Sequence, residues 1–488
     1  MINSKAKTGR IHHAASNVLR QRVFPTMKDD QVVRAIRYDH LIILFGNKLC
    51  QKYQDPHFYD MIRQKMRQLG RFLIEARKKS KDISDLFSVF YPKNYDAVIS
   101  AIQSLAGLNE TQTGFRVPSL ATALGTLLKQ VGKLCVSKYI KDQNKENQIL
   151  TEDFIKLLTE DYGSSIARTA LETCAREKRN KKIVLPTNED LTKLQMFLRD
   201  KIKQNFSALE EKFNRQAWTD LASSVLVSLL LFNRRRPGEL ERIYIEDYRS
   251  HEKIGAHNIG PEYDNLSMEQ KNSAAHYVRF EIRGKLVRTV AVLVHQDLRK
   301  CIDLFLAYRK QAGVDSKSPY LFGVAGYLKG DFKYLRAYEL LRRYAEECGA
   351  PNPISLRGTT LRKHVATMCV SFNLSDQEIS DLANFLGHSK QIHRDYYRQP
   401  IIVREILHMT KLLETVQGCG EGRLGQISDA DDESDVDDPG TTAARTGDPV
   451  HGSGELFDES NKSMHGNTSF GECSKTTKKT RSGKGKYI

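Results

Sequence analysis

The spacing of apolar residues predicts a chain built mostly of helices. From Asp30 onward, apolar residues recur at steps of three and four, as they do on one face of an α-helix. This spacing predicts helices near residues 30–45, 59–78, 119–134 and 152–176, and a second helical region from Asn188 on. Residues 221–232 are almost wholly apolar, which is typical of a helix buried on all sides. Later helices are expected at 298–308, 336–347, 362–372, 376–386 and 403–416.

Two short segments between these helices have the pattern of β-strands instead. In residues 277–283, Val278, Phe280 and Ile282 fall on one face and polar residues fall on the other. Gly284 and the residue after it begin a turn, and 287–294 is a second β-rich run. The segments predict a β-hairpin, so the expected fold class is mainly α with a small β-sheet.

Shifts in composition divide the chain into four parts. Residues 1–29 are polar and basic and are expected to form a flexible arm, and 30–180 are expected to form a helical domain. That domain ends in a charged stretch, REKRNKK, and a second, mainly α domain with the hairpin is expected at 185–415. Residues 417–488 contain an acidic run, many Gly and Ser residues and a basic end, so a disordered tail is expected there.

The charge of the chain suggests a polyanionic partner. Residues 416–488 hold 9 of the 76 basic and 13 of the 59 acidic residues, so residues 1–415 carry a net charge of +21. Such a basic folded part favours nucleic acid as partner, although a soluble basic protein without such a partner has the same composition.

Other classes of protein do not fit the composition. The 488 residues include no apolar run of about 18, the length that a membrane helix needs, and the N-terminus lacks the apolar stretch of a signal peptide. The eight cysteines form no CxxC pair, which indicates a reducing compartment and neither a disulfide framework nor a zinc site. No cofactor, metal or small-molecule substrate is expected.

Candidate chemistry begins directly after the apolar segment 221–232. The sequence NRRRPGELERIYIED places Arg236 and Glu239 three residues apart, and Lys285 lies at the tip of the expected hairpin. Taken singly, an Arg and a Glu at this spacing can be a surface ion pair, and a lysine in a turn is usually solvated.

Two further motifs follow toward the C-terminus. TTLRKHVAT contains Arg362, and LGHSKQIHRDYY contains His388 and Tyr397. Alone, the histidine could be structural and the tyrosine could pack in a core. The order and spacing of all four motifs make a functional site the better interpretation.

Over residues 185–415, these motifs resemble the tyrosine recombinase (phage integrase) family. The resemblance implies a catalytic domain of the DNA breaking–rejoining type, preceded by a helical, core-binding-like DNA-binding domain at 30–180. It implies two phosphate-binding arginines, a general-acid lysine, a phosphate-binding histidine, a tyrosine nucleophile, an adjacent tyrosine that competes with it and a supporting carboxylate, at Arg236, Arg362, Lys285, His388, Tyr397, Tyr396 and Glu239.

One position departs from the family pattern. The family has a histidine three residues before the second arginine, and this chain has Thr359 there. His364, two residues after that arginine, is a candidate stand-in, although it aligns with a family position that is not catalytic.

The N-terminal half, together with the motifs RFEIRGK and LRKHVAT, resembles a subgroup of animal recombinases related to Crypton mobile elements. The family resemblance implies double-stranded DNA as the partner. A nuclear location is expected from this role, from the reduced cysteines and from basic clusters such as residues 475–486. The wider family works as dimers or tetramers that exchange a C-terminal helix, for which 403–416 is the candidate.

The function implied is site-specific DNA recombination or integration through a 3′-phosphotyrosyl intermediate, without metal or ATP. Two alternatives stay open. The chain could be a domesticated, non-catalytic DNA-binding protein of transcription or chromatin, or it could have a type IB topoisomerase-like activity with the same catalytic set.

Overall fold

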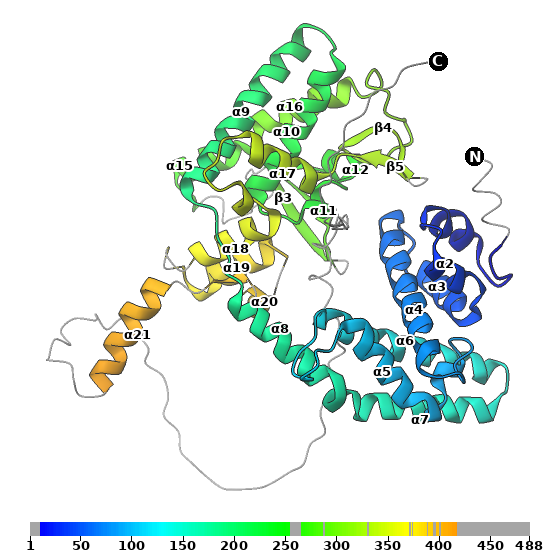
Figure 1. The fold of residues 1–488 in the computed structure, drawn as a ribbon. Helices are drawn as coiled ribbons and strands as arrows, with labels where there is room; N and C mark the ends of the chain where they lie inside the picture. The colour runs from blue at the N-terminus through cyan, green and yellow to red at the C-terminus, as the bar shows by residue number, and fades with distance from the viewer. Residues whose placement is uncertain are drawn as a thin grey trace, which may run out of the picture. The chain divides into compact units, whose positions relative to one another are not determined.

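The computed structural model describes residues 10–253, 265–285, 288–328, 331–369, 372, 374–387, 389–393, 397–399 and 402–416. The described residues form two compact units, unit 1 up to Asn180 and unit 2 from Lys181 on (Figure 1). They are mostly helical, with two small antiparallel sheets. The predicted fold class, mainly α with a small β-sheet, is confirmed. The expected tail at 417–488 lies outside the described residues.

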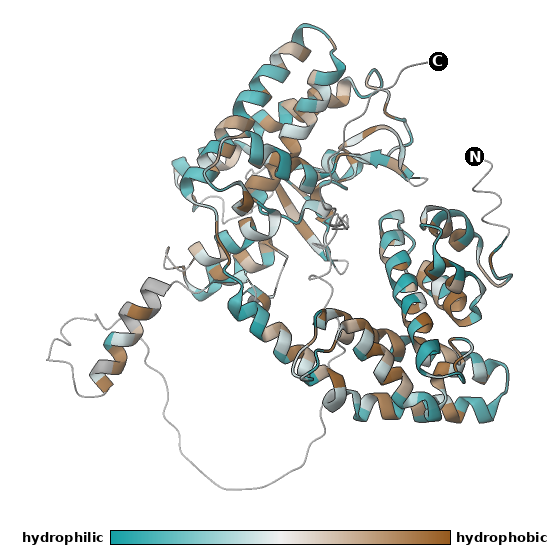
Figure 2. Cartoon of the chain, viewed as in Figure 1, coloured by the Kyte–Doolittle hydropathy of each residue, from teal (hydrophilic) through white to brown (hydrophobic). Residues whose placement is uncertain are grey.

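The described part of unit 1 is built of helices whose apolar stripes meet in one core (Figure 2). They are α2 (Gln31–Tyr38), α3 (His40–Lys52), α4 (Tyr59–Lys79), α5 (Tyr95–Ala106), α6 (Pro118–Lys141), α7 (Lys145–Glu160) and α8 (Arg168–Asn180). Helix α4 packs on α2, α3 and α5, and α6 packs on α5, α7 and α8. Gly70 lets α2 and α4 approach closely, because a Cβ there would lie 2.7 Å from Ile36 Cγ1.

Two expectations for unit 1 are wrong. The residues of the expected flexible arm 1–29 that the structure describes are ordered, because Leu19, Val23 and Phe24 are buried in the core of the unit. The single helix expected at 152–176 is divided into α7 and α8, because a π-helical segment, Gly163–Ala167, interrupts the α-helical geometry between them.

Unit 2 is a helical domain that also contains both sheets. Its helices are α9 (Asn188–Glu211), α10 (Arg215–Asn233), α11 (Pro237–Leu240), α12 (Ile245–Arg249), α15 (Met268–Ala275), α16 (Gln296–Ala307), α17 (Ala337–Glu347), α18 (Gly358–Met368), α19 (Asp376–Phe385), α20 (Lys390–Ile392) and α21 (Ile402–Val416). Its strands are β1 (Glu252–Lys253), β2 (Tyr277–Arg283), β3 (Thr289–His295), β4 (Gly323–Leu328) and β5 (Asp331–Tyr334).

Helix α10 is the centre of unit 2, as its apolar sequence predicts. It packs against α9, α16, α17 and β3. Trp218, the one tryptophan of the chain, is buried on α10 and donates from its indole nitrogen to the Phe305 carbonyl of α16 at 2.7 Å. The N-terminal part of this helix is therefore anchored on α16, and the arginine motif begins at its other end.

The predicted hairpin is formed by β2 and β3, with β1 added at its edge. The strands are antiparallel, Phe280 opposes Val292 and Ile282 opposes Val290, and all four side chains are buried. The alternation along 277–283 therefore predicted the buried face correctly. The second hairpin, β4 and β5, was not predicted, because these short strands contain two glycines and little alternation.

None of the helices in the described part of the chain combines the length and the apolar character needed to cross a bilayer.

Candidate active site

A tight turn after α10 carries the three arginines of the first motif. Asn233, the last residue of α10, is buried and holds the turn against β3, because its side chain donates to the Leu293 carbonyl at 2.9 Å and accepts from the Leu293 N–H at 2.8 Å. Arg234 follows in the left-handed conformation, with φ of 53°, which ends the helix. The chain then directs Arg235 into the protein interior, whereas the side chain of Arg236 stays 20% exposed.

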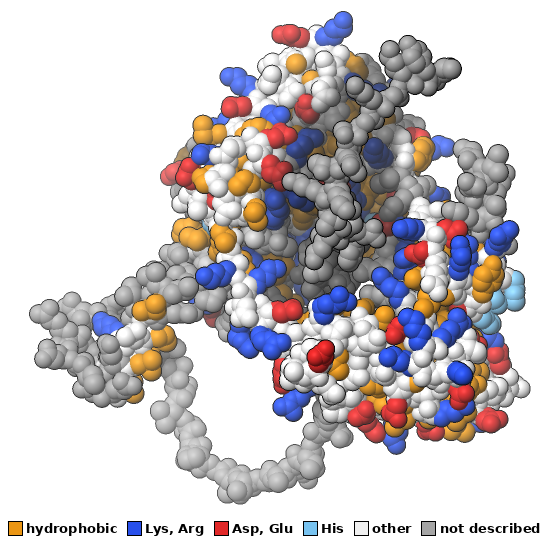
Figure 3. Space-filling view, viewed as in Figure 1, with side chains coloured by type: hydrophobic (Ala, Val, Ile, Leu, Met, Phe, Trp, Pro, Cys, Tyr) orange, Lys and Arg blue, Asp and Glu red, His pale blue; other side chains and the backbone are white. Residues whose placement is uncertain are grey.

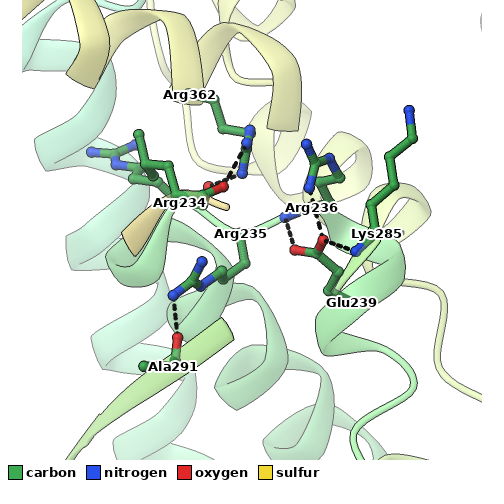
Figure 4. A network of polar contacts seen from close by, with 8 residues as sticks. Arg234, Arg235, Arg236, Glu239, Lys285, Ala291 and Arg362 are labelled. Carbon is green, nitrogen blue, oxygen red and sulfur yellow. Dashed lines mark hydrogen bonds and ion pairs between the residues drawn. The ribbon is translucent and has the colours of Figure 1, made fainter. Parts of the chain in front are cut away.

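Glu239 joins this turn to the tip of the first hairpin (Figure 4). Its carboxylate accepts from Arg236 Nη1 at 2.9 Å and from the Arg236 backbone N–H at 3.2 Å. The same carboxylate accepts from the backbone N–H of Lys285 at 3.3 Å, which leaves the lysine side chain exposed at the hairpin tip. Because the Glu239 side chain is only 6% exposed, this pairing is shielded from solvent.

Arg362 brings three distant segments together. It lies on α18, is 2% exposed, and donates to the Arg234 carbonyl at 3.0 Å and to the Leu386 carbonyl at 2.9 Å. Its guanidinium also lies over the ring of Tyr397, 5.0 Å from the centroid, and hydrogen-bonds to that side chain. Burial lowers the pKa of Arg362, whereas the contact with Tyr397 opposes the decrease. The second predicted arginine and the predicted nucleophile are therefore neighbours.

Glycine permits the close approach of the turn after α19. Gly387 has φ of +73°, and a Cβ there would lie 3.2 Å from Val290 Cγ1 and 3.7 Å from Arg236 Nη1. This turn therefore lies against both the hairpin and the first predicted arginine.

Arg235 is a buried member of the cluster that sequence reasoning missed. Its guanidinium donates to the Ala291 carbonyl of β3 and lies over the Phe385 ring of α19, 4.3 Å from the centroid. Burial lowers the pKa of Arg235 to about 10, the charge of Glu239 opposes this, and the nearby arginines add to it. Its Nε and Nη1 have no hydrogen-bond partner among the described residues. A run of three arginines contains no local signal for which of them faces inward.

The other predicted residues have different outcomes. His388 and Tyr396 lie outside the described residues. Thr359 is exposed in the first turn of α18, and no contact places it in the cluster. His364 is half-buried, and its pKa is lowered by burial and by the charge of Arg234. Neither residue supplies an imidazole beside Arg362 on this geometry.

His393 is a second residue that sequence reasoning missed. It belongs to the same motif as the predicted nucleophile and is only 3% exposed. Burial and the charge of Arg362 lower its pKa. The signal was present in the sequence as a histidine four residues before Tyr397, but only the folded structure shows that it is buried and under the charge of Arg362.

The cluster has a strong excess of positive charge. Arg235, Arg236 and Arg362 all lie within the influence of one carboxylate, that of Glu239. Guanidinium groups match the geometry of phosphate oxygens and keep their charge at any physiological pH. The arrangement can therefore bind a phosphate group next to a tyrosine hydroxyl. Among the described residues, no group of three or more His, Cys, Asp or Glu side chains is placed to hold a metal ion.

No protein-family profile and no curated protein matches this sequence. Among solved structures, the matches include two complexes of the XerH site-specific recombinase. The pre-cleavage complex with the difH substrate is 15% identical, with a TM-score of 0.33, over 80% of this chain and 98% of that chain. The post-cleavage complex with a palindromic difH substrate is 16% identical, with a TM-score of 0.40, over 84% and 93%. Such low identities and TM-scores assign neither a family nor an activity to this chain.

Proposed function

We propose that the chain is a DNA strand-breaking and rejoining enzyme of the tyrosine recombinase type. One observation carries the proposal: the fold brings Arg362 onto the ring of Tyr397 and within the charge of the Arg236–Glu239 pair, although these residues come from distant parts of the sequence. Such a cluster offers a nucleophile and a phosphate-binding site together. Double-stranded DNA is the phosphodiester that also fits the net charge of +21 on residues 1–415.

The chemistry divides into two reversible steps. The Tyr397 oxygen attacks a phosphorus atom of the DNA backbone, the bond to the 5′-oxygen breaks, and a 3′-phosphotyrosyl ester forms. The two arginines bind the non-bridging oxygens and stabilise the charge of the transition state. Attack by a 5′-hydroxyl on the ester reverses the step and rejoins DNA without ATP.

The hairpin tip is the proposed source of the proton for the leaving oxygen. Lys285 is exposed, and its backbone is tied to Glu239 beside Arg236. A side chain at this position can reach a phosphate bound by the two arginines once DNA covers the site. His388 is proposed to contact the same phosphate.

Other parts of the chain are proposed to hold the DNA and a second subunit. Lys and Arg side chains are spread over the visible surface of both units, so phosphate contacts should dominate affinity and binding should weaken steeply with salt (Figure 3). Helix α21 exposes Ile406, Met409, Leu412, Leu413 and Val416, an apolar face that suits exchange with another copy in a dimer or tetramer. We also propose a nuclear location and membership of the Crypton-like subgroup.

A non-catalytic, DNA-binding role is the second candidate, and Thr359 favours it. This residue is exposed and takes the place of a family histidine. The two functions differ in one measurable step, the covalent bond to DNA.

We expect Tyr397→Phe to abolish covalent attachment to DNA, because the phenylalanine ring keeps the packing against Arg362 and lacks the nucleophilic oxygen. The measurement starts with duplexes that the full chain selects from a randomised pool. Nicked versions, which trap the cleaved state, are then tested for an SDS-stable adduct.

Tyr396→Phe is the matched control and should keep the adduct. An adduct lost only in Tyr397→Phe supports the enzyme, and loss only in Tyr396→Phe moves the nucleophile by one residue. Bound DNA without any adduct supports the non-catalytic candidate.

A further inference from the structure

His393 lies one helical turn before Tyr397. The backbone N–H of Arg398 donates to the His393 carbonyl at 3.1 Å, which closes a five-residue turn of the π-helical kind. His393 and Tyr397 therefore belong to one and the same turn of the chain. Both the histidine, 3% exposed, and the tyrosine, 7% exposed, are buried. Arg362 acts on both of them, through its charge on the imidazole and through its contact with the phenol ring.

Tyr397 needs an acceptor for its proton when it attacks phosphorus. Arg362, its neighbour, is a guanidinium with donors only, so it can stabilise the phenol oxygen but cannot take the proton. The carboxylate of Glu239 already accepts from Arg236 and from the backbone of Lys285. A neutral imidazole, in contrast, has one nitrogen that can accept a proton.

We propose that the imidazole of His393 is the general base that takes the hydroxyl proton of Tyr397 during strand cleavage. The inference rests on the proposed function and adds a catalytic residue to it. As the bond between the tyrosine oxygen and phosphorus forms and the bond to the 5′-oxygen breaks, the phenol proton moves to the imidazole. The leaving 5′-oxygen takes its proton from Lys285, the proposed general acid. On rejoining, the imidazolium returns the proton to the tyrosine oxygen.

The electrostatic surroundings suit this role. Burial and the charge of Arg362 both lower the pKa of His393 from its ordinary 6.5, so the imidazole is neutral at pH 7. Arg362 is in turn influenced by Arg236, Glu239 and Tyr397. A base of this kind should be active at neutral pH and should lose activity when acid protonates it.

The other candidate imidazole has a different neighbour. His364 is under the charge of Arg234 rather than that of Arg362, although it is also half-buried. Thr359 lies on the exposed side of α18. The geometry therefore assigns the proton-accepting role to the motif of the nucleophile itself rather than to helix α18.

The test is single-turnover cleavage of the nicked duplex by the full chain between pH 5 and 8, at saturating DNA. We expect His393→Gln to cleave about 10²–10⁴-fold more slowly than wild type at neutral pH. It should also lose the decrease in rate that wild type shows below pH 6.5, while its affinity for DNA stays the same. His276→Gln, an exposed histidine that contacts Gln296, is the control and should keep the wild-type rate and pH profile.

The outcomes separate this inference from the proposed function. A wild-type adduct through Tyr397, together with an unchanged rate and pH profile in His393→Gln, overturns the inference and leaves the function standing. If His364→Gln, rather than His393→Gln, loses the decrease in cleavage rate at acid pH, the inference is also overturned. If wild type forms no adduct on DNA that it binds, both proposals fail.

A folding defect would not hide the answer. Fluorescence of Trp218 shows whether unit 2 of each variant is folded, and His393→Asn offers a second, smaller substitution. If neither variant folds, the pH profile of the wild-type protein decides. A cleavage rate that does not fall as the pH is lowered below 6.5 rules out a histidine base.

Discussion

Replacing Glu239 with alanine is expected to lower the free energy of unfolding of unit 2 by about 3–5 kcal/mol, because the variant loses the carboxylate of a buried ion pair. The carboxylate accepts two hydrogen bonds from Arg236 and one from the backbone of Lys285. Its charge also acts on Arg235 and Arg362. Without it, these guanidiniums repel one another in a site with little solvent to screen them.

Urea unfolding followed by Trp218 fluorescence measures this loss, since the one tryptophan of the chain reports on unit 2. Glu189→Ala is the control: Glu189 pairs with Lys193 at 2.9 Å on the surface of α9, and such exposed pairs contribute about 0–1 kcal/mol. Sulfate should restore part of the stability of Glu239→Ala, because an anion bound to the folded cluster favours the folded state. Equal losses in the two variants would contradict the expectation.

The elements that the sequence predicted well are those whose pattern is local and strong. Strand β2 runs over the predicted residues 277–283, because a half-buried strand must alternate. Helix α10, Arg215–Asn233, contains the predicted 221–232 and extends it in the N-terminal direction, where Asn214 accepts from the N–H groups of Gln216 and Ala217. In both, the apolar pattern and the packing lead to the same structure.

The errors come from tertiary contacts that outweigh local composition. The segment before Asp30 is basic and weakly patterned, yet Leu19 and Val23 are fully buried, and Arg20 donates to the His12 carbonyl. Hairpin β4–β5 has its own cross-strand pairs, such as Tyr327 with Phe332, whose spacing is not periodic along the chain. No single-sequence pattern marks such pairs.

The site was predictable as a set of motifs and not as an arrangement. The order of motifs pointed to Arg236, Arg362 and Tyr397, and the structure brings these three together. The order of motifs could not show that Arg235 lies on the Phe385 ring, or that His393 is under the charge of Arg362. Both depend on where α18 and α19 pack.

The second large effect is expected at Arg236. We expect Arg236→Lys to reduce the rate of strand cleavage by about 10²–10³-fold while the affinity for DNA changes little, because a lysine keeps the charge but lacks the paired donors that hold two phosphate oxygens. The stability of unit 2 should hardly change, since a lysine can still pair with Glu239 and the side chain is already 20% exposed. Single-turnover trapping gives the rate, and Trp218 fluorescence gives the stability.

Comparison with Arg362 separates catalysis from folding. Arg362→Lys should reduce both the cleavage rate and the stability of unit 2, because the Arg362 side chain is buried and donates to the carbonyls of Arg234 and Leu386. Each buried carbonyl that is left unpaired costs about 1–3 kcal/mol. Arg242→Lys is the control. Arg242 follows Arg236 in the same motif but pairs with Glu241 instead of Glu239, so its replacement should leave the cleavage rate unchanged. If Arg236→Lys cleaves at the wild-type rate while Arg362→Lys merely unfolds, the cluster is a structural ion network, and the phosphate must bind elsewhere.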